Sequence, residues 1–172
     1  NGDQSYPLTL RQDLISQIPY LKKKYLEYNK YKNQTIQNIF SEEQLSTAIT
    51  LNTTTHESRI YVNEGGKLVA TALPTLAQLA PIFDLLISDI NKDGKSDIVT
   101  VGNFEASKPE LGSYMAMPMT ILLQSKKTLE FTPHYPFVPS GEIRSVGKLK
   151  INGNEYLVAA YNDDKLRVFR IK

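Results

Sequence analysis

The chain contains no cysteine and no tryptophan, and it has only two histidines, His56 and His134. Without cysteine there can be no disulfide, no thiol nucleophile and no Cys-ligated zinc. The two histidines occur in unrelated contexts, which argues against a metal site built from several histidines. The sequence also lacks any apolar run approaching the roughly 20 residues of a transmembrane helix.

An excess of charge of one sign is missing as well. Twenty Lys and Arg residues face 18 Asp and Glu residues, which gives a net charge of +2. This balance does not favour binding to nucleic acid or to a membrane surface. The 172 residues fit one domain of ordinary size. Because the sequence starts at Asn1 without an initiator Met or a signal peptide, we expect a piece of a longer protein that carries its targeting information elsewhere.

The most informative segment is the polar loop over residues 89–97. Oxygen-bearing residues occupy its positions 1, 3, 5 and 9, with glycine at position 6, and these residues are Asp89, Asn91, Asp93, Asp97 and Gly94. Calcium takes six to eight oxygens at about 2.3–2.6 Å, and glycine permits the tight turn that lets alternate side chains converge. The pattern predicts a calcium site made of the four side chains and the backbone carbonyl of Lys95.

An EF-hand and an ordinary hairpin turn are the two other interpretations of this loop. An EF-hand would place a glutamate at position 12, but this position holds Thr100, and both flanks are short β-branched runs typical of strands. The loop is therefore predicted to connect two strands of a β-hairpin. An ordinary polar hairpin turn is the alternative, because Asp-Gly is also a common turn dipeptide.

The first 46 residues are predicted to be helical. Thr9 with Gln12, and Ser41 with Gln44, resemble capping boxes, and Pro19 is expected to divide one helix ending near Ile18 from the next. One helical face is predicted to be apolar and buried, and its residues are Leu14, Ile18, Leu21, Tyr25 and Tyr28.

The remaining residues, 47–172, are predicted to form β-strands at 48–51, 59–62, 68–70, 82–87, 98–101 and 166–171. The overall fold class is therefore mainly β with an N-terminal α-helical segment, in antiparallel sheets resembling β-propeller blades. We expect a single unit in which the helices of residues 1–46 pack on the β region of 47–172.

A weak internal repeat of about sixty residues relates segments 59–104 and 120–164. The repeat matches residues 97–103 with residues 156–162. The counterparts of the four side-chain ligands are Lys148, Lys150, Asn152 and Tyr156, whereas the loop glycine is kept as Gly153. Ligands present in one copy and lost in the other favour a specific metal site over a requirement of the turn.

Residues 83–99, which read FDLLISDINKDGKSDIV, resemble the FG-GAP or VCBS repeat, a calcium-loop unit of β-propellers. Residues 101–104 with Tyr114, and the closing segment 161–170, resemble the C-terminal region of the ASPIC/UnbV and cartilage-acidic-protein group. Segments within residues 11–45 resemble the helical insertion that precedes the last blades there. One departure is Met115, where members of this group often carry an acidic residue after the tyrosine.

The resemblance implies a non-catalytic, calcium-binding module with Ca²⁺ as its cofactor and a structural or adhesive role. It also implies an exported protein, either secreted or at the cell surface or outer membrane, whose partner is the rest of its parent or another surface protein. The alternative is an accessory carbohydrate-binding part of a larger propeller enzyme, which leaves a glycan as a possible ligand.

A stretch of alternating lysines and tyrosines over residues 20–32 was also considered. Such a stretch can bind single-stranded nucleic acid by stacking and charge. With the charge balanced, we favour an amphipathic helix with Tyr25 and Tyr28 inward, and a tyrosine patch for a sugar or a partner stays open. No nucleophile with an adjacent base was found in a motif context, so no catalytic residue and no enzyme activity is predicted.

Overall fold

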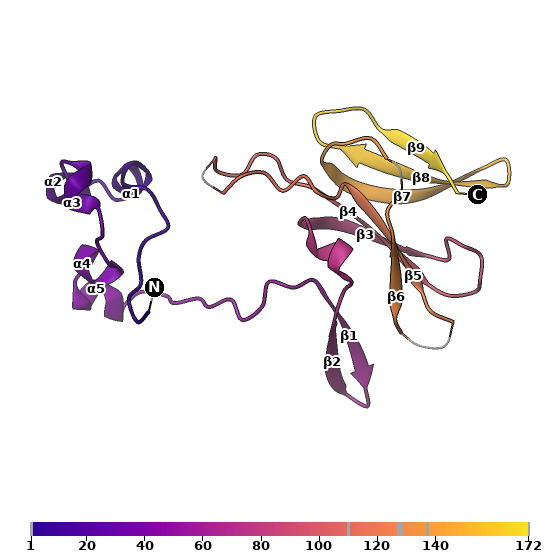
Figure 1. Cartoon of the computed structure of the whole chain (residues 1–172), viewed down its shortest axis with the longest axis horizontal. Coiled ribbons are helices and arrows are strands. Elements are labelled where there is room, and N and C mark those ends of the chain that lie inside the picture. Colours follow the sequence, from indigo (N-terminus) through magenta and orange to yellow (C-terminus); the bar gives the residue numbers. More distant parts are fainter. Residues whose placement is uncertain (1, 110, 127–128, 137, 172) are drawn as a thin grey trace. The chain divides into compact units, whose positions relative to one another are not determined.

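The computed structural model describes residues 2–109, 111–126, 129–136 and 138–171, and it is mainly β with short N-terminal helices (Figure 1). The chain divides into two compact units, Asn1–Thr54 and Thr55–Lys172. The predicted fold class is confirmed at this level. The packing of the helices on the sheets stays a prediction. None of the helices among the described residues has the length and apolar character needed to cross a membrane.

The first unit is built from five short helices. They are α1 (Arg11–Gln17), α2 (Leu21–Lys24), α3 (Tyr28–Tyr31), α4 (Ile36–Ile39) and α5 (Glu42–Ser46). The break at Pro19 is confirmed, because α1 ends at Gln17 and α2 begins at Leu21. Proline disrupts the helix that precedes it and is tolerated in the first turn of the next.

A small core holds this unit together, and its buried residues are Leu14, Ile15, Leu21, Tyr25 and Ile39. The prediction for Tyr28 is wrong, because this side chain is 65% exposed. Residues 20–32 contain two helices separated by a non-helical junction over residues 25–27, so Tyr28 does not continue the face of Tyr25. Arg11 reaches across this junction and donates to the carbonyls of Tyr25 at 2.7 Å and Leu26 at 2.9 Å.

Of the two predicted capping boxes, one is present and the other is absent. Ser41 and Gln44 form a complete capping box at α5, as predicted. Thr9 does not cap α1, whose N-cap is Leu10 without a side-chain bond. A further capping box, formed by Thr35 and Asn38 at α4, was not predicted.

The second unit contains three antiparallel sheets. They consist of β1 (Arg59–Glu64) and β2 (Lys67–Ala72); of β3 (Ile82–Ser88), β4 (Asp97–Gly102), β5 (Met119–Gln124) and β6 (Phe131–His134); and of β7 (Ile143–Ile151), β8 (Asn154–Tyr161) and β9 (Arg167–Arg170). Within each sheet, neighbouring strands follow the order of the sequence (Figure 1). The strand predicted at 48–51 does not form, and Ile49 and Leu51 are each 89% exposed.

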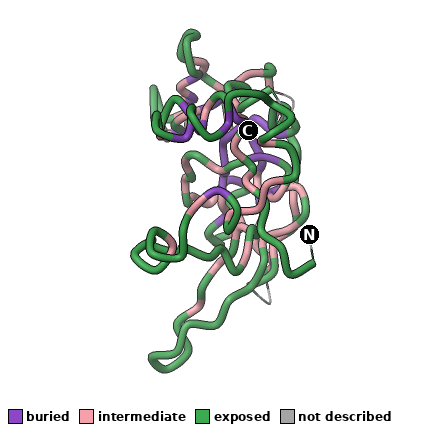
Figure 2. Tube along the Cα trace, turned by 90° about the vertical axis from the view of Figure 1, so that its left-hand side faces the viewer, coloured by how far each residue is buried: buried purple, intermediate pink, exposed green. Residues whose placement is uncertain are grey.

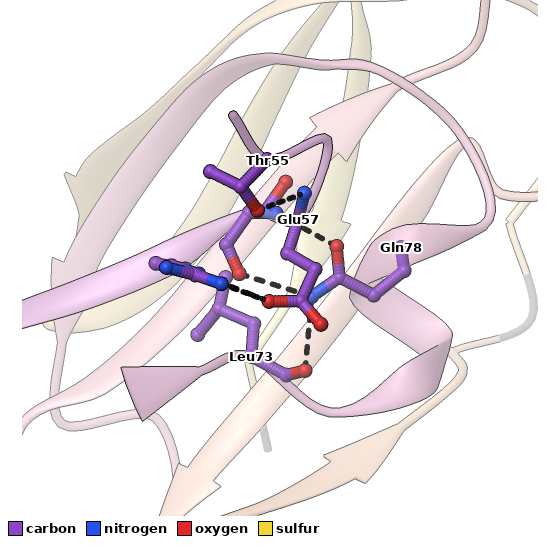
Figure 3. A network of polar contacts seen from close by, with 6 residues as sticks. Thr55, Glu57, Leu73 and Gln78 are labelled. Atoms are coloured by element: carbon purple, nitrogen blue, oxygen red, sulfur yellow. Dashed lines mark hydrogen bonds and ion pairs between the residues drawn. The ribbon is translucent and has the colours of Figure 1, made fainter. Parts of the chain in front are cut away.

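The β1–β2 hairpin is joined at its base to the short 3-10 helix η1 (Thr75–Gln78) by a polar network (Figure 3). The Gln78 side chain accepts from the Ser58 N–H at 2.8 Å and donates to the Ser58 and Leu73 carbonyls, both at 2.9 Å. The Leu73 N–H also donates to the Ser58 carbonyl, at 2.9 Å. The Gln78 amide therefore joins both chain segments at the base of the hairpin to η1.

The two larger sheets share one core, to which each contributes from one face. Its buried residues include Val99, Met119, Ile143, Leu157 and Ala159. The tips of the hairpins are mostly exposed (Figure 2). Strand β7 lies against β3 and β4, and the Asp84 carboxylate accepts there from the Ser145 hydroxyl at 2.7 Å and the Val146 N–H at 3.0 Å. These bonds, that of Ser145 first, hold the pKa of Asp84 below its usual value.

The β3–β4 and β7–β8 hairpins have the same register. Each carries an irregularity at the second residue of its first strand, between Ile82 and Asp84 in one and between Ile143 and Ser145 in the other. The pair Ser88 with Asp97 corresponds to the pair Leu149 with Tyr156. Eight residues, 89–96, close the first hairpin, and the six residues 150–155 occupy the corresponding place in the second.

A glycine allows close approach near the irregularity of each hairpin, in one case on β4 and in the other just before β7. A Cβ on Gly102 of β4 would lie 1.9 Å from the Pro81 carbonyl oxygen. In the other hairpin the residue in the place of Gly102 is Tyr161, and the glycine is Gly141, whose Cβ would lie 2.8 Å from the Tyr161 ring. The close contact is thus with a backbone oxygen in one hairpin and with an aromatic ring in the other, and each requires a residue without a Cβ.

The sheets do not coincide with the predicted repeats 59–104 and 120–164. Strands β3 and β4 of the first repeat pair with β5 and β6 of the second in one four-stranded sheet. The structural unit that recurs therefore begins at β3 and again at β7. The repeat is visible in the hairpins, and its boundaries are shifted from those read in the sequence.

Candidate metal site

All five predicted calcium ligands lie in or at the end of one loop, which joins β3 to β4. The backbone is left-handed at two positions, Lys92 with φ 61° and Gly94 with φ 85°. Glycine adopts this conformation without steric cost, which explains the glycine at position 6. The loop therefore has the tight turns that the spacing predicts.

The structure brings Asp89, Asn91 and Asp93 together around the backbone of the turn. The Asp89 carboxylate accepts from the N–H groups of Asp93 at 3.0 Å and Gly94 at 2.9 Å. Asn91 accepts from the Asp93 N–H at 3.1 Å, and its amide nitrogen donates to the Asp93 carboxylate at 3.2 Å. Asp93 in turn accepts from the N–H of Lys95 at 2.9 Å. These bonds fold the three side chains inward over the turn.

Asp97 differs from the other three because it is completely buried. One carboxylate oxygen accepts from the N–H groups of Ile90 at 2.8 Å and Asn91 at 3.4 Å, and the other accepts from the Gln124 N–H at 3.0 Å. Asp97 therefore links the start of the loop to the end of β5. A buried carboxylate requires such donors, so this residue has a structural role whether or not a metal is bound.

The described residues contain no group of three or more Asp, Glu or His side chains placed so that they could hold a metal ion. The carboxylates of the loop bond to its own backbone instead of converging on one point. The donor set nevertheless suits a hard cation, since it consists of oxygens only, and each carboxylate oxygen of Asp89 and Asp93 keeps a lone pair beyond the one hydrogen bond it accepts. Asp89, Asn91 and Asp93 are the residues that would hold calcium. Asp97 would support them by holding the backbone at the start of the loop.

The corresponding turn of the β7–β8 hairpin has no such side chains. Asn152 and Gly153 form it with φ values of 49° and 79°, which is the two-residue hairpin turn that Asn-Gly favours. Equivalent residues of β3 and β7 are 61 positions apart in the sequence, and those of β4 and β8 are 59 positions apart. The structural counterpart of Asp89 is therefore Lys150, and the counterpart of Asp97 is Tyr156, as in the sequence comparison. The second hairpin is two residues shorter, and it has a lysine in the place of Asp89 and a tyrosine in the place of Asp97.

A second polar cluster, around Glu142, was not found from the sequence. Glu142 is buried and accepts from the Glu105 N–H at 2.5 Å and the Asn162 amide at 2.6 Å, and it pairs with Arg144 at 2.9 Å. The bond from Glu105 leads these contacts in lowering the pKa of the Glu142 carboxyl. Its partners come from segments 20 and 37 residues away, so no local sequence pattern indicates it.

A hollow of about 430 Å³ lies beside this cluster and is lined mainly by acidic and amide residues, among them Glu105, Glu142, Asn162, Asp163 and Asp164. Its aromatic residue, Tyr161, is only 7% exposed and lies beneath the Arg167 guanidinium at 4.8 Å. The ring therefore offers no free face for a sugar. The two histidines, His56 and His134, are both exposed, and His134 is the last residue of β6.

No protein-family model matches the chain, and searches of curated proteins and of solved structures found no significant match. The likeness to FG-GAP and VCBS repeats therefore depends on the loop and its flanking strands.

Proposed function

We propose that the protein is a non-catalytic module whose β3–β4 loop binds Ca²⁺. The observation that carries this proposal is the contrast between two hairpins of the same register. One closes with the Asn-Gly turn that suffices for such a hairpin, while the other uses a longer loop with Asp89, Asn91 and Asp93 folded over its turn. The longer, acid-rich loop is not needed to connect the strands.

The geometry of the loop indicates weak binding. The Asp89 and Asp93 carboxylates bond to backbone N–H groups, and they must turn toward an ion at the expense of part of these bonds. Extracellular calcium modules bind with dissociation constants of roughly 10⁻⁴ to 10⁻³ M. An affinity in that range matches the calcium concentration outside the cell and supports an extracytoplasmic location.

The proposed role is structural or adhesive, in a blade-like arrangement related to FG-GAP and VCBS repeats. Propeller blades are four-stranded antiparallel sheets, and β3 to β6 form one such sheet in sequence order. The β7–β9 sheet repeats its first three strands. Calcium would stiffen the tip of a hairpin in this array, and the partner would be the rest of the parent protein or another surface protein.

The test is thermal unfolding of the full chain in EDTA and in about 10 mM calcium, roughly 10 to 100 times the expected dissociation constant. A ligand at that excess stabilises the folded state by about 1.4–2.7 kcal/mol. For a domain of this size that raises Tm by about 3 °C or more. Asp93→Ala should remove most of the shift.

Asn152→Ala, in the matched turn, is the control and should keep the full shift. Titration calorimetry with calcium chloride should show one site. Equal melting curves in calcium and EDTA, with no heat of binding up to about 10 mM calcium, an order of magnitude above that affinity range, would refute the proposal.

A further inference from the structure

Strand β9 ends its sheet, whereas its counterpart in the other sheet does not. β5 pairs with β4 as β9 pairs with β8, with Ile98 opposite Leu122 in one sheet and Leu157 opposite Phe169 in the other. The far side of β5 carries β6. Among the described residues no strand pairs with the far side of β9, so the three-stranded sheet lacks the equivalent of β6.

The backbone groups at this edge are oriented for pairing. The N–H of Ile171 donates to the Glu155 carbonyl of β8 at 3.0 Å. In an antiparallel ladder alternate residues bond to the same neighbour, so the N–H and C=O groups of Val168 and Arg170 point away from β8. They form the row of unpaired groups that a further strand can bind.

An apolar cavity opens beside the same edge. It has a volume of about 490 Å³ and lies where the two larger sheets face one another, lined by Met119, Leu157, Phe169 and Ile171 among others. Phe169 and Ile171 belong to the face of β9 that looks into the core. Apolar side chains of a strand added to β9 would alternate toward this face and enter the cavity.

A basic hollow lies beside the same edge, and Arg170 and Ile171 line both it and the apolar cavity. Lys92, Lys150 and Arg170 line this hollow, which has a volume of about 420 Å³ and whose one acidic residue, Glu155, is paired with Lys148 at 3.0 Å. Pairing of β9 with β9 of a second copy would bring the arginines of the two strands close together, and like charges facing each other destabilise a sheet. The charge therefore favours an acidic occupant over a second copy.

We propose that the free edge of β9 binds an extended acidic segment of a partner protein by strand addition. The segment adds a fourth strand, with its apolar residues in the cavity and its carboxylates beside Arg170. This inference goes beyond calcium binding and does not depend on it.

The probe is the blocked, fluorescently labelled peptide Ser-Glu-Ile-Asp-Val-Glu-Ile-Ser, titrated with the full chain by fluorescence anisotropy, in calcium and in EDTA. Its control replaces each acid with lysine and should bind at least tenfold more weakly. Two N-methylated versions test the backbone. Methylation of the residues whose N–H faces β9 should abolish binding, whereas methylation of the alternate set should leave it within about twofold.

Two substitutions test the protein side. Val168→Pro removes an outward N–H that no strand uses, which an edge strand tolerates, and should weaken binding at least tenfold while circular dichroism stays unchanged. Arg170→Glu should remove the preference for the acidic peptide, and Lys67→Glu on β2 should not.

The proposal is overturned if the acidic peptide does not bind at 1 mM, or if it binds equally well in both methylated forms. It is also overturned if ultracentrifugation shows a dimer that Val168→Pro abolishes, because the edge would then be used by a second copy.

Discussion

The β3–β4 and β7–β8 hairpins form a comparison inside one chain. Their strands share a register and an irregularity at the same position, and both contribute buried residues to one core. They differ at the tip, where one has an eight-residue loop that contains Asp89 and Asp93 and the other a two-residue Asn-Gly turn within a longer ladder. The strands are thus held by what they pack against, and the tip is free to differ.

The comparison shows which residue of the loop matters to the fold. The shorter turn has no acid in the place of Asp89 or of Asp93, whereas Asp97 and Tyr156 occupy equivalent places opposite Ser88 and Leu149. Asp97 is buried and Tyr156 is half-buried. The loop therefore has one structural acid and two acids that are available for a ligand.

The largest effect is expected for Asp97→Ala. The substitution leaves three backbone N–H groups without an acceptor in a buried place, and each unsatisfied group costs about 1–3 kcal/mol. We expect the free energy of unfolding, measured by urea denaturation in EDTA, to fall by about 3 kcal/mol. Tyr156→Phe is the matched control and should change it by less than about 0.5 kcal/mol. A small effect of Asp97→Ala in EDTA would show that this acid serves a ligand alone.

Exchange of the tips is expected to have the next largest effect. Replacing residues 89–96 with residues 150–155 should keep the fold, because the matched pairs on either side of the tip are retained. The chimera should lose the calcium-dependent stabilisation of about 1.4–2.7 kcal/mol that the ion provides. Thermal unfolding with and without calcium measures both results. Loss of the native fold would mean that the longer tip helps to hold the strands.

Asp84→Ala tests the bond between the two hairpins themselves. The substitution leaves the Val146 N–H and the Ser145 hydroxyl without their acceptor and should cost about 1–2 kcal/mol at pH 7. Since the pKa of Asp84 is lowered in the folded state, its contribution is fully present above the unfolded pKa of about 3.9 and is lost as pH falls through the lower folded value.

Urea denaturation of wild type and Asp84→Ala between pH 7 and pH 2.5 should therefore show two stabilities that differ at neutral pH and converge in acid. Ser145→Ala removes only one of the two donors and should have the smaller effect. A difference that persisted unchanged at pH 2.5 would rule out the ionised carboxylate as its cause.

The smallest effect is expected for Lys148→Ala. Its ammonium pairs with Glu155 at 3.0 Å and donates to Ser88 at 3.0 Å, but both ionic side chains are partly exposed. Such pairs contribute about 0–1 kcal/mol. Denaturation at low and at 1 M salt should give a difference from wild type of at most about 0.5 kcal/mol, which salt reduces. A larger loss would indicate that this lysine organises the tip of the second hairpin.

Much of the β region could be predicted because its strands are short β-branched runs bounded by turn residues. Residues 82–87 and 98–101 have this pattern, and their strands lie within a residue or two of the predicted bounds. Residues 48–51 share the composition but find no partner strand, and they remain exposed. A strand needs a neighbour, and local pattern does not supply that information.

The candidate site was predictable only in its local part. The spacing of Asp89, Asn91, Asp93 and Gly94 identified a tight loop, which the backbone angles confirm. The structural role of Asp97 could not be predicted from local spacing, because one of its hydrogen-bond donors is the N–H of Gln124, 27 residues later in the sequence. Tyr28 was misplaced for a related reason, since the helix that would have turned it inward ends after Lys24.

The two glycines at the irregularities have a consequence for how the sequence can vary. Gly102 lies against the Pro81 carbonyl, and in the other hairpin Gly141 lies against the Tyr161 ring. At position 102 the obstacle is a backbone oxygen, which every residue at position 81 carries, so no substitution at 81 makes room for a side chain there. At position 141 the obstacle is a side chain, but the backbone φ of 138° also favours glycine. We therefore expect related sequences to keep glycine at both positions, and a smaller residue at 161 to relieve the contact at 141 without removing the backbone strain there.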